Sequence, residues 1–443
     1  MRIQLSDHFT YKKLFRFTLP TITMMIFTSI YGVVDGFFVS NFAGKTSFAA
    51  INLIMPFVMI LGGMGFMVGT GGTALVSRVL GEGNKDKANR YFSMMIYLTL
   101  LLGIVLTVFG VIFMRPIAEL LGATDAMMES CVTYGRIVIG FTAAFMLQNV
   151  FQSFLITAEK PKLGLLATIA AGCTNMALDA LFVGVFTWGV AGAAIATGIS
   201  QCVGGVFPLI YFIRKNDSLL QLKLTKFELK PILKALGNGS SELMSNISSS
   251  VVSMVYNFQL LKYIGENGVS AFGVLMYVQF IFIAIYIGYS IGTTPIIGYN
   301  YGSENHNELK NMLKKSIKLM SIAGIILSAL AFVLSGPLAK IFVGYDKELF
   351  ELTHRAFKLF SLSFIFSGFN IFTSSFFTGL NNGAVSAAIS FLRTLLFQTS
   401  SVLVLPMILG VDGIWLAITV AEVAACIISI SFLIAKHKKY KYF

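Results

Sequence analysis

The chain has 443 residues, of which 56% are hydrophobic and only 12% are charged. Soluble proteins carry about 25% charged residues, so a soluble globule is excluded, and disorder is excluded because it requires low hydrophobicity. The net charge of +13 does not indicate nucleic-acid binding, because the basic residues cluster in short connections between apolar runs. The composition predicts an all-α polytopic membrane protein with no nucleic acid among its partners.

Twelve apolar runs are long enough to cross a bilayer, because a hydrocarbon core of about 30 Å needs about 20 helical residues. In chain order they are 14–38, 47–74, 91–114, 131–156, 164–186, 190–213, 241–264, 269–296, 317–343, 357–379, 384–409 and 413–435. The run 47–74 is rich in glycine and could be broken or tilted. The run 241–264 is polar enough to face protein or water rather than lipid.

The distribution of Lys and Arg predicts the orientation in the membrane. A cytoplasmic N-terminus places 25 of the 33 basic residues on the inner side and 8 on the outer side. The chain begins without a short apolar core and a small-residue cleavage site, so we expect the first run to stay as a membrane helix. We therefore predict a multi-pass protein of the plasma (inner) membrane with both termini in the cytoplasm.

The longest connection, 214–236, is basic and amphipathic and divides the runs into two groups of six. We predict an N-terminal six-helix lobe over 1–213, a cytoplasmic linker over 214–236 that lies on the membrane surface as a helix, and a C-terminal lobe over 237–443.

The two groups of runs also repeat in sequence. Four glycines of the first half recur in the second half 221 residues later, a separation that we call the repeat offset. The pairs are Gly44 and Gly265, Gly81 and Gly302, Gly189 and Gly410, and Gly192 and Gly413. Since six spans return to their starting side, the lobes should be related by a pseudo-two-fold axis along the membrane normal.

Sequence motifs of soluble enzymes occur, but their contexts are wrong. The sequence from Gly288 to Gly292 matches a nucleophile elbow, but all four histidines lie outside the apolar runs, so no base accompanies the serine. Lys45 and Thr46 imitate the end of a phosphate-binding loop, but Val39 stands where its first glycine is required. The four cysteines show no metal spacing. We predict no enzyme activity and no cofactor, and energy from an ion gradient or the substrate's own gradient.

Acids inside the apolar runs are informative, because each costs roughly 2.5–3.5 kcal/mol to insert at mid-bilayer. Four stand out: Asp35, Asp179, Glu242 and Glu422. Asn175 precedes Asp179 by four residues, which puts both side chains on one helix face. Carboxylate and amide oxygens suit a proton or Na⁺. The repeat offset pairs Asp35 with Tyr256 and Asp179 with Ser400, so the first half carries a site that the fold does not require.

Several of these residues keep two interpretations. Asp35 and Asp179 could be helix-end aspartates that face water. Glu242 is either a helix-entry residue near the cytoplasmic face or a second titrating group, and Glu422 is either a structural partner of a neighbouring helix or functional. Pro20 permits a kink in the first run, static or mobile. A polar row in the fourth run could line a cavity: Gln148, Asn149 and Gln152.

These residues resemble the multidrug and toxin extrusion (MATE) family, in its bacterial DinF-like branch, over essentially the whole chain. The resemblance is carried by Pro20 and Asp35, by LGEGNKDKANR at 80–90, by Asn175 and Asp179 with GVAGAAIAT at 189–197, and by PIIGYNYGSEN at 295–305. It implies two six-helix lobes around a central cleft that opens alternately to each side. It also implies export of lipophilic, often cationic compounds in exchange for H⁺ or Na⁺.

The resemblance also assigns roles to residues. Asp35, Asn175, Asp179 and Thr197 match the ligands of a cation site for H⁺ or Na⁺ in the N-terminal lobe, and Pro20 matches the proline where the first helix bends. Candidates for the substrate cavity are Tyr134, Gln148, Gln152 and Glu242. Relatives with a cation site in the C-terminal lobe carry a glutamate near Ser249 and Ser250, about two turns beyond Glu242, so such a site is not expected here.

We therefore predict a cation-coupled multidrug efflux antiporter that works by alternating access, as a monomer, on small lipophilic or cationic substrates and among membrane lipids. The alternative is a lipid-linked oligosaccharide flippase of the same superfamily, which would need a strongly cationic cavity for a pyrophosphate headgroup. A channel is disfavoured because the sequence has no filter-like repeated loop.

Overall fold

The computed structural model describes residues 3–39, 42 and 45–443, and every regular element within them is helical. The first half contains α1 (Tyr11–Phe38), α2 (Lys45–Gly81), α3 (Lys85–Leu120), α4 (Asp125–Gly140), α5 (Thr142–Thr157), α6 (Pro161–Asp179), the π-helical turn η2 (Ala180–Val185) and α7 (Gly189–Ile213). The second contains α8 (Leu229–Tyr263), α9 (Glu266–Gly302), α10 (His306–Val343), α11 (Lys347–Ser361), α12 (Phe364–Gly379), α13 (Gly383–Phe391), the π-helical turn η3 (Leu392–Phe397), α14 (Gln398–Leu409) and α15 (Val411–Tyr440).

The helices account for twelve membrane spans. Among the described residues, nine helical stretches are long and apolar enough to cross a bilayer, and the bent pairs α4–α5 and α11–α12 bring the number to eleven. The twelfth is the polar helix α8, whose 35 residues extend about 52 Å. The pairs are bent by 53° and 48°, so the expected runs 131–156 and 357–379 are not single straight helices. The glycine-rich run 47–74 lies within one continuous helix, α2.

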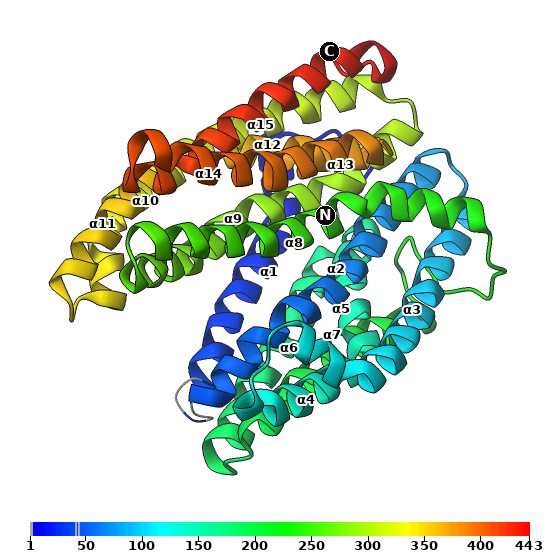
Figure 1. Cartoon of the computed structure of the whole chain (residues 1–443). Coiled ribbons are helices and arrows are strands. Elements are labelled where there is room, and N and C mark those ends of the chain that lie inside the picture. Colours follow the sequence, from blue (N-terminus) through cyan, green and yellow to red (C-terminus); the bar gives the residue numbers. More distant parts are fainter. Residues whose placement is uncertain (1–2, 40–41, 43–44) are drawn as a thin grey trace.

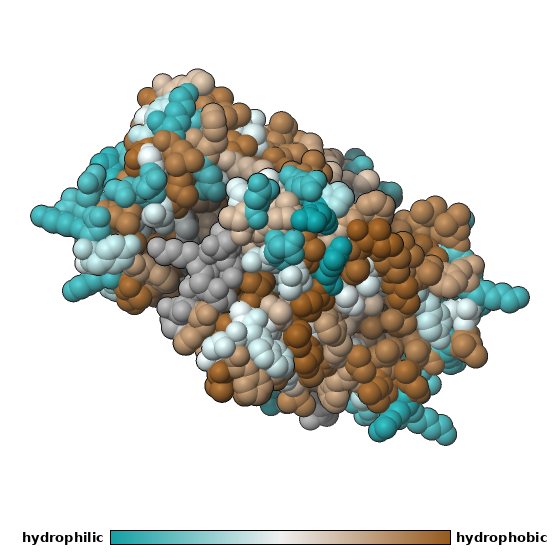
Figure 2. Space-filling model, turned by 60° about the horizontal axis from the view of Figure 1, so that its bottom comes forward, coloured by the Kyte–Doolittle hydropathy of each residue, from teal (hydrophilic) through white to brown (hydrophobic). Residues whose placement is uncertain are grey.

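The surface has the character of a membrane protein. On the face shown in Figure 2, hydrophobic side chains cover broad areas, and hydrophilic ones are gathered in clusters, many of them at the left and right edges of the view. Large apolar side chains such as Leu101, Ile104 and Val108 of α3 are more than half exposed. Lipid can cover such a surface, whereas water would leave it aggregation-prone.

The two halves of the chain repeat the same arrangement. Both ends of α9 lie exactly one repeat offset beyond the corresponding ends of α2. Both ends of α12 lie one residue further than that offset from those of α5, because the break before α12 has two residues and the break before α5 has one. Figure 1 shows α1–α7 and α8–α15 as two lobes that diverge away from the region where they touch. Gly44, one of the four repeated glycines, lies outside the described residues.

The lobes meet where glycines let the backbones touch. A Cβ on Gly81 of α2 would lie 2.0 Å from the Tyr299 carbonyl oxygen, and one on Gly302 of α9 would lie 1.9 Å from the Arg78 oxygen. The repeat offset relates Gly81 to Gly302 and Arg78 to Tyr299, so the two contacts exchange under the pseudo-two-fold, as in an isologous dimer. This reciprocity confirms two pseudo-symmetric lobes.

We call this contact region the glycine interface, formed by Gly71, Gly81, Gly239, Gly298 and Gly302. Gly71 of α2 and Gly239 of α8 approach each other's backbones, and a Cβ on Gly298 would lie 2.2 Å from Ser77 Oγ. All five residues lie toward the end of the bundle where α1 and α8 begin and where α2 and α9 end. We call it the basic end, because the sequence predicts it to be the Lys- and Arg-rich cytoplasmic side.

The first two turns of α1 and α8 pack into the opposite lobes. Leu14 of α1 is fully buried in the hydrophobic core of the C-terminal lobe. Ala235 of α8, which the repeat offset pairs with Leu14, is fully buried in the core of the N-terminal lobe. The lobes therefore exchange their leading segments at the basic end.

The predicted surface helix over 214–236 is wrong. Residues 214–228 are not helical, and α8 already begins at Leu229. The backbone N–H groups of Gln221 and Lys223 donate to Asn89 Oδ1 (3.0 Å) and Ser93 Oγ (2.8 Å) of α3, so they need no helical partners. The Lys223 ammonium also donates to Asp86 (2.8 Å) and lowers the pKa of that carboxyl.

Candidate functional site: an acidic pocket in the N-terminal lobe

One face of α6 carries the residues that approach α1. Gly172, Asn175 and Asp179 are three and four residues apart, which places them on the same side of the helix. A Cβ on Gly172 would lie 2.5 Å from the Phe27 ring and 3.0 Å from the Tyr31 ring. The missing side chain therefore lets α1 lie directly against this face of α6.

The same register brings two carboxyl groups together. Phe27, Tyr31 and Asp35 follow one another at intervals of four along α1, so Asp35 extends the face that contacts Gly172. The Asp35 and Asp179 carboxyl groups lie side by side, and Asn175 adjoins Asp35. The helix changes to the π-helical turn η2 directly after Asp179, a distortion that is frequent at functional sites.

We call Asp35, Asn175 and Asp179 the acidic pocket. Asp179 is fully buried and Asn175 is 2% exposed. Asp35 Oδ1, Asn175 Oδ1 and both Asp179 carboxylate oxygens are buried and receive no hydrogen bond from the described residues. All of these atoms are acceptors, so a cation, a proton or a donating water molecule would satisfy them.

Other predicted residues gather around this pocket. Tyr134 is 1% exposed and lies near enough to both aspartates to feel their charge. Gln148 is buried, adjoins Tyr31 and packs against Gly204 of α7. Gln152 lies one turn further along α5, with its Oε1 atom buried and without a donor among the described residues.

Thr197 lies on α7, the helix that packs along α6, and its carbonyl accepts a hydrogen bond from Ser200 Oγ (2.7 Å). Sequence reasoning missed Gln201, one turn later on the same helix face, whose Oε1 atom is buried without a donor among the described residues. It also missed Tyr31. The spacing of four from Tyr31 to Asp35 and from Thr197 to Gln201 is the signal that could have identified both.

Pro20 lies inside α1, fifteen residues and about 22 Å before Asp35. It borders a cavity of about 360 Å³ at the basic end, between α1 and the start of α6, which Arg16 and Lys162 also line. A proline that removes a helical hydrogen bond beside free volume is suited to bending.

Glu242 is not a helix-entry residue, because α8 begins thirteen residues earlier at Leu229. It lies on the same face of α8 as Gly239 and Asn246, three and four residues away. That face is turned to α2, where a Cβ on Gly63 would lie 3.4 Å from the Asn246 amide. Glu242 therefore belongs to the contact between the lobes and not to the acidic pocket.

Glu422 contacts neighbouring helices, as expected if its role is structural. It is 1% exposed, and its carboxylate accepts hydrogen bonds from Arg393 Nε (2.9 Å to Oε1) and from Asn370 Nδ2 (2.7 Å to Oε2). Arg393 lies on the π-helical turn η3. The C-terminal lobe thus neutralises its buried acid with a cation of its own.

The described residues contain no group of three or more His, Cys, Asp and Glu side chains that could hold a metal ion. The acidic pocket instead supplies carboxylate and amide oxygens, the hard ligands that suit Na⁺ or a proton.

The arrangement defines a class: a twelve-span membrane transport protein built from two lobes that meet at one end. A comparison with protein families matches the MatE model to residues 20–181 and 243–401, and the chain belongs to this family of transporters. The predicted family is thereby confirmed, as is the prediction that the protein is not an enzyme.

Similar proteins agree with this assignment. Two relatives are each called "Multidrug export protein MepA". The one from Staphylococcus saprophyticus is 27% identical over 81% of this chain and 80% of its own. The one from Staphylococcus haemolyticus is 26% identical over 93% of this chain and 90% of its own. A solved structure described as the outward-facing conformation of a multidrug resistance MATE family transporter matches with a TM-score of 0.92, at 24% identity and over 98% of both chains.

Proposed function

We propose that this protein exports lipophilic, predominantly cationic compounds across the plasma membrane in exchange for H⁺ or Na⁺. The observation that carries the proposal is the set of buried acceptor oxygens on Asp35, Asn175 and Asp179 that have no donor among the described residues. Two carboxylates side by side in a poorly hydrated site resist double ionisation, so the pocket should bind a cation or keep a proton.

Coupling follows if the drug and the coupling cation favour different conformations. A cation in the acidic pocket removes the repulsion between Asp35 and Asp179, so α1 can draw closer to α6, with Pro20 as the bend. This would reshape the substrate cavity that the resemblance predicts near Tyr134 and Gln148 and expel the drug, and release of the cation inside would reset the protein. Antiport requires only that each ligand has a differential affinity for the two states.

The orientation and the oligomeric state belong to the same proposal. If the basic end is cytoplasmic, contact at the glycine interface closes the cytoplasmic side, and the diverging lobes correspond to an outward-open state. The solved neighbour described as outward-facing supports this interpretation. One chain supplies both halves of the pseudo-symmetric interface, which supports a monomer surrounded by lipid.

The flippase alternative fits the charges less well. A pyrophosphate headgroup needs unpaired cations. Arg393, a largely buried cation of the C-terminal lobe, is held by Glu422, and the acidic pocket between α1 and α6 presents carboxylates instead. The relatives named as multidrug export proteins also favour drug export.

The test is dye accumulation in bacteria that lack their own exporters. Cells that express the protein should accumulate less of a lipophilic cationic dye than cells with an empty vector, whereas an anionic dye of similar size should be unaffected. Export of the anionic dye alone, with the cationic dye neither moved nor inhibitory, would overturn the substrate assignment.

A further inference from the structure

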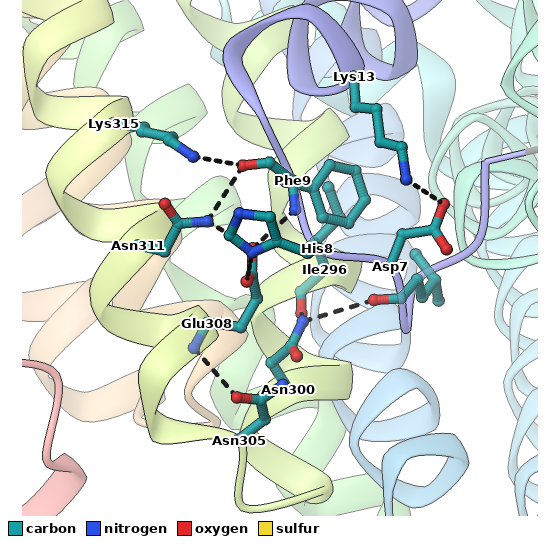
Figure 3. Close-up of polar contacts among 11 residues, drawn as sticks. Asp7, His8, Phe9, Lys13, Ile296, Asn300, Asn305, Glu308, Asn311 and Lys315 are labelled. Atoms are coloured by element: carbon teal, nitrogen blue, oxygen red, sulfur yellow. Dashed lines mark hydrogen bonds and ion pairs between the residues drawn. The ribbon is translucent and has the colours of Figure 1, made fainter.

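The residues before α1 form an ordered segment at the basic end, which we call the N-terminal arm (residues 3–10). Leu5 and Phe9 of this arm are fully buried, so its two apolar side chains belong to the hydrophobic core. Figure 3 shows it beside the start of α10, with His8 and Phe9 directed to the side chains of that helix.

Several groups of the C-terminal lobe hold the arm. Glu308 of α10 accepts the Phe9 N–H on Oε1 (3.0 Å), and its Oε2 atom lies 2.7 Å from His8 Nδ1. Asn311 Nδ2 and Lys315 Nζ donate to the Phe9 carbonyl at 3.0 and 2.6 Å. Both backbone groups of Phe9 are therefore paired with α10 (Figure 3).

The arm also reaches the N-terminal lobe. The Leu5 N–H donates to Glu159 Oε1 (2.8 Å) in the turn between α5 and α6, and the Leu5 carbonyl accepts from Asn300 Nδ2 of α9 (3.4 Å). Leu5 thus links a turn of one lobe to a helix of the other, next to the glycine interface.

The fold itself does not require either acid. Asn305 caps α10 through the Glu308 N–H, just as Asn84 caps α3 through Lys87, so a lysine stands in the first lobe where Glu308 stands in the second. Glu159 has a φ of +58°, a conformation that favours glycine or asparagine, and the equivalent turn of the second lobe has Asn381 there. Their contacts with the arm give both glutamates a role.

We propose that the N-terminal arm is a clasp that holds the two lobes together at the basic end and must be released before the transporter opens there. The inference goes beyond the proposed function but rests on its alternating access. Opening the basic end separates the α5–α6 turn from α9 and α10, so the arm cannot keep both sets of contacts. Phe9 is bound by three groups of α10, so the bond from Leu5 to Glu159 is the one that should break.

The experiment measures the distance between the lobes by pulsed electron paramagnetic resonance. Nitroxide labels on Lys85→Cys of α3 and Lys438→Cys of α15, two exposed positions at the basic end of different lobes, are introduced into a cysteine-free full-length chain. The protein is measured in lipid nanodiscs without drug. It therefore reports on the lobes even if the substrate assignment is wrong.

Glu308→Gln should raise the ratio of long to short distances about fivefold, the lower range of typical coupling between sites. Deletion of residues 3–9 should raise it at least as much. Glu304→Gln is the matched control: it removes the same charge from an exposed position one turn away and should leave the distances unchanged. The deletion combined with Glu308→Gln should match the deletion alone, because both act through one clasp.

Unchanged distances in both Glu308→Gln and the deletion would overturn the clasp. Additive shifts in the combined variant would overturn it as well, because Glu308 would then act independently of the arm. An equal shift of the distances in Glu304→Gln would also overturn it, because the loss of any negative charge in this region would then explain the effect of Glu308→Gln. If Glu308→Gln fails to fold, Glu159→Gln tests the same clasp from the other lobe and should give the same lengthening.

Discussion

At the residue scale, the buried acids of the two lobes have different surroundings. Glu422 is neutralised by Arg393 and Asn370, whereas the buried oxygens of Asp35 and Asp179 have no donor among the described residues. A cation beside a buried acid neutralises it, whereas two adjacent buried carboxylates resist double ionisation unless a proton or another cation binds between them. On this contrast we propose that coupling lies in the N-terminal lobe.

Replacing either aspartate by asparagine should abolish export without preventing folding. The amide keeps the shape of the side chain but removes the charge that binds the coupling cation, so we expect Asp35→Asn and Asp179→Asn to lower drug efflux at least about tenfold. Glu242→Gln should be milder, since Glu242 lies at the contact between the lobes. Efflux is measured in cells at matched membrane expression.

Near-normal efflux from Asp35→Asn, or a deeper loss from Glu242→Gln than from either aspartate variant, would move the coupling site out of the N-terminal lobe.

Glu422→Gln should lower the stability of the protein, because Glu422 neutralises Arg393 and is not part of the acidic pocket. The substitution leaves Arg393, a largely buried cation, without its anion, and breaking a buried pair costs roughly 3–5 kcal/mol. We expect a clearly lower melting temperature in detergent, whereas Glu351→Gln at an exposed position of α11 should melt like the parent. A melting temperature equal to that of the parent would show that the pair is not structural.

At the element scale, contact of α1 with the core of the C-terminal lobe extends past Pro20 to Met25, and Asp35 lies against α6 further along the helix. Pro20→Ala restores a helical hydrogen bond and stiffens the helix. We expect severalfold slower efflux with unchanged cation binding, measured by calorimetry on purified protein. Pro116→Ala inside α3 is the control and should transport normally, and equal losses in both variants would contradict a specific hinge.

The sequence predicted those features of the helices that depend on local patterns of residues. Apolar length predicted the twelve spans, and the spacing of four on α6 placed Asn175 with Asp179. The prediction of a helical linker was wrong because backbone N–H groups of the linker donate to Asn89 and Ser93 of α3. No local sequence pattern indicates such a tertiary contact. Glu308 and Glu159 were missed for the same reason, since both accept from the backbone of a distant segment.

At the scale of the whole molecule, closure of the basic end depends on backbones that touch. A Cβ on Gly239 of α8 would lie 1.9 Å from the Met67 carbonyl oxygen, whereas one on Gly237 would have no neighbour within 4 Å. Gly239→Ala should therefore force the lobes apart and reduce efflux strongly. Gly237→Ala, two residues away with the same change in helix propensity, should leave efflux unchanged.

The distance between the basic ends of the lobes, measured with the labels on Lys85→Cys and Lys438→Cys, should lengthen in Gly239→Ala only. If Gly239→Ala keeps both the parent distance and the parent efflux, the glycine interface is not what closes this side.

Ion flux in proteoliposomes tests most directly whether cation movement through the acidic pocket drives export. Purified protein is reconstituted with a pH-sensitive or a Na⁺-sensitive dye inside, and a lipophilic cation is added outside. We expect substrate-dependent counterflow of H⁺ or Na⁺ that is absent in Asp35→Asn and Asp179→Asn. Substrate transport with no flux of either ion, or an undiminished flux in both variants, would contradict it.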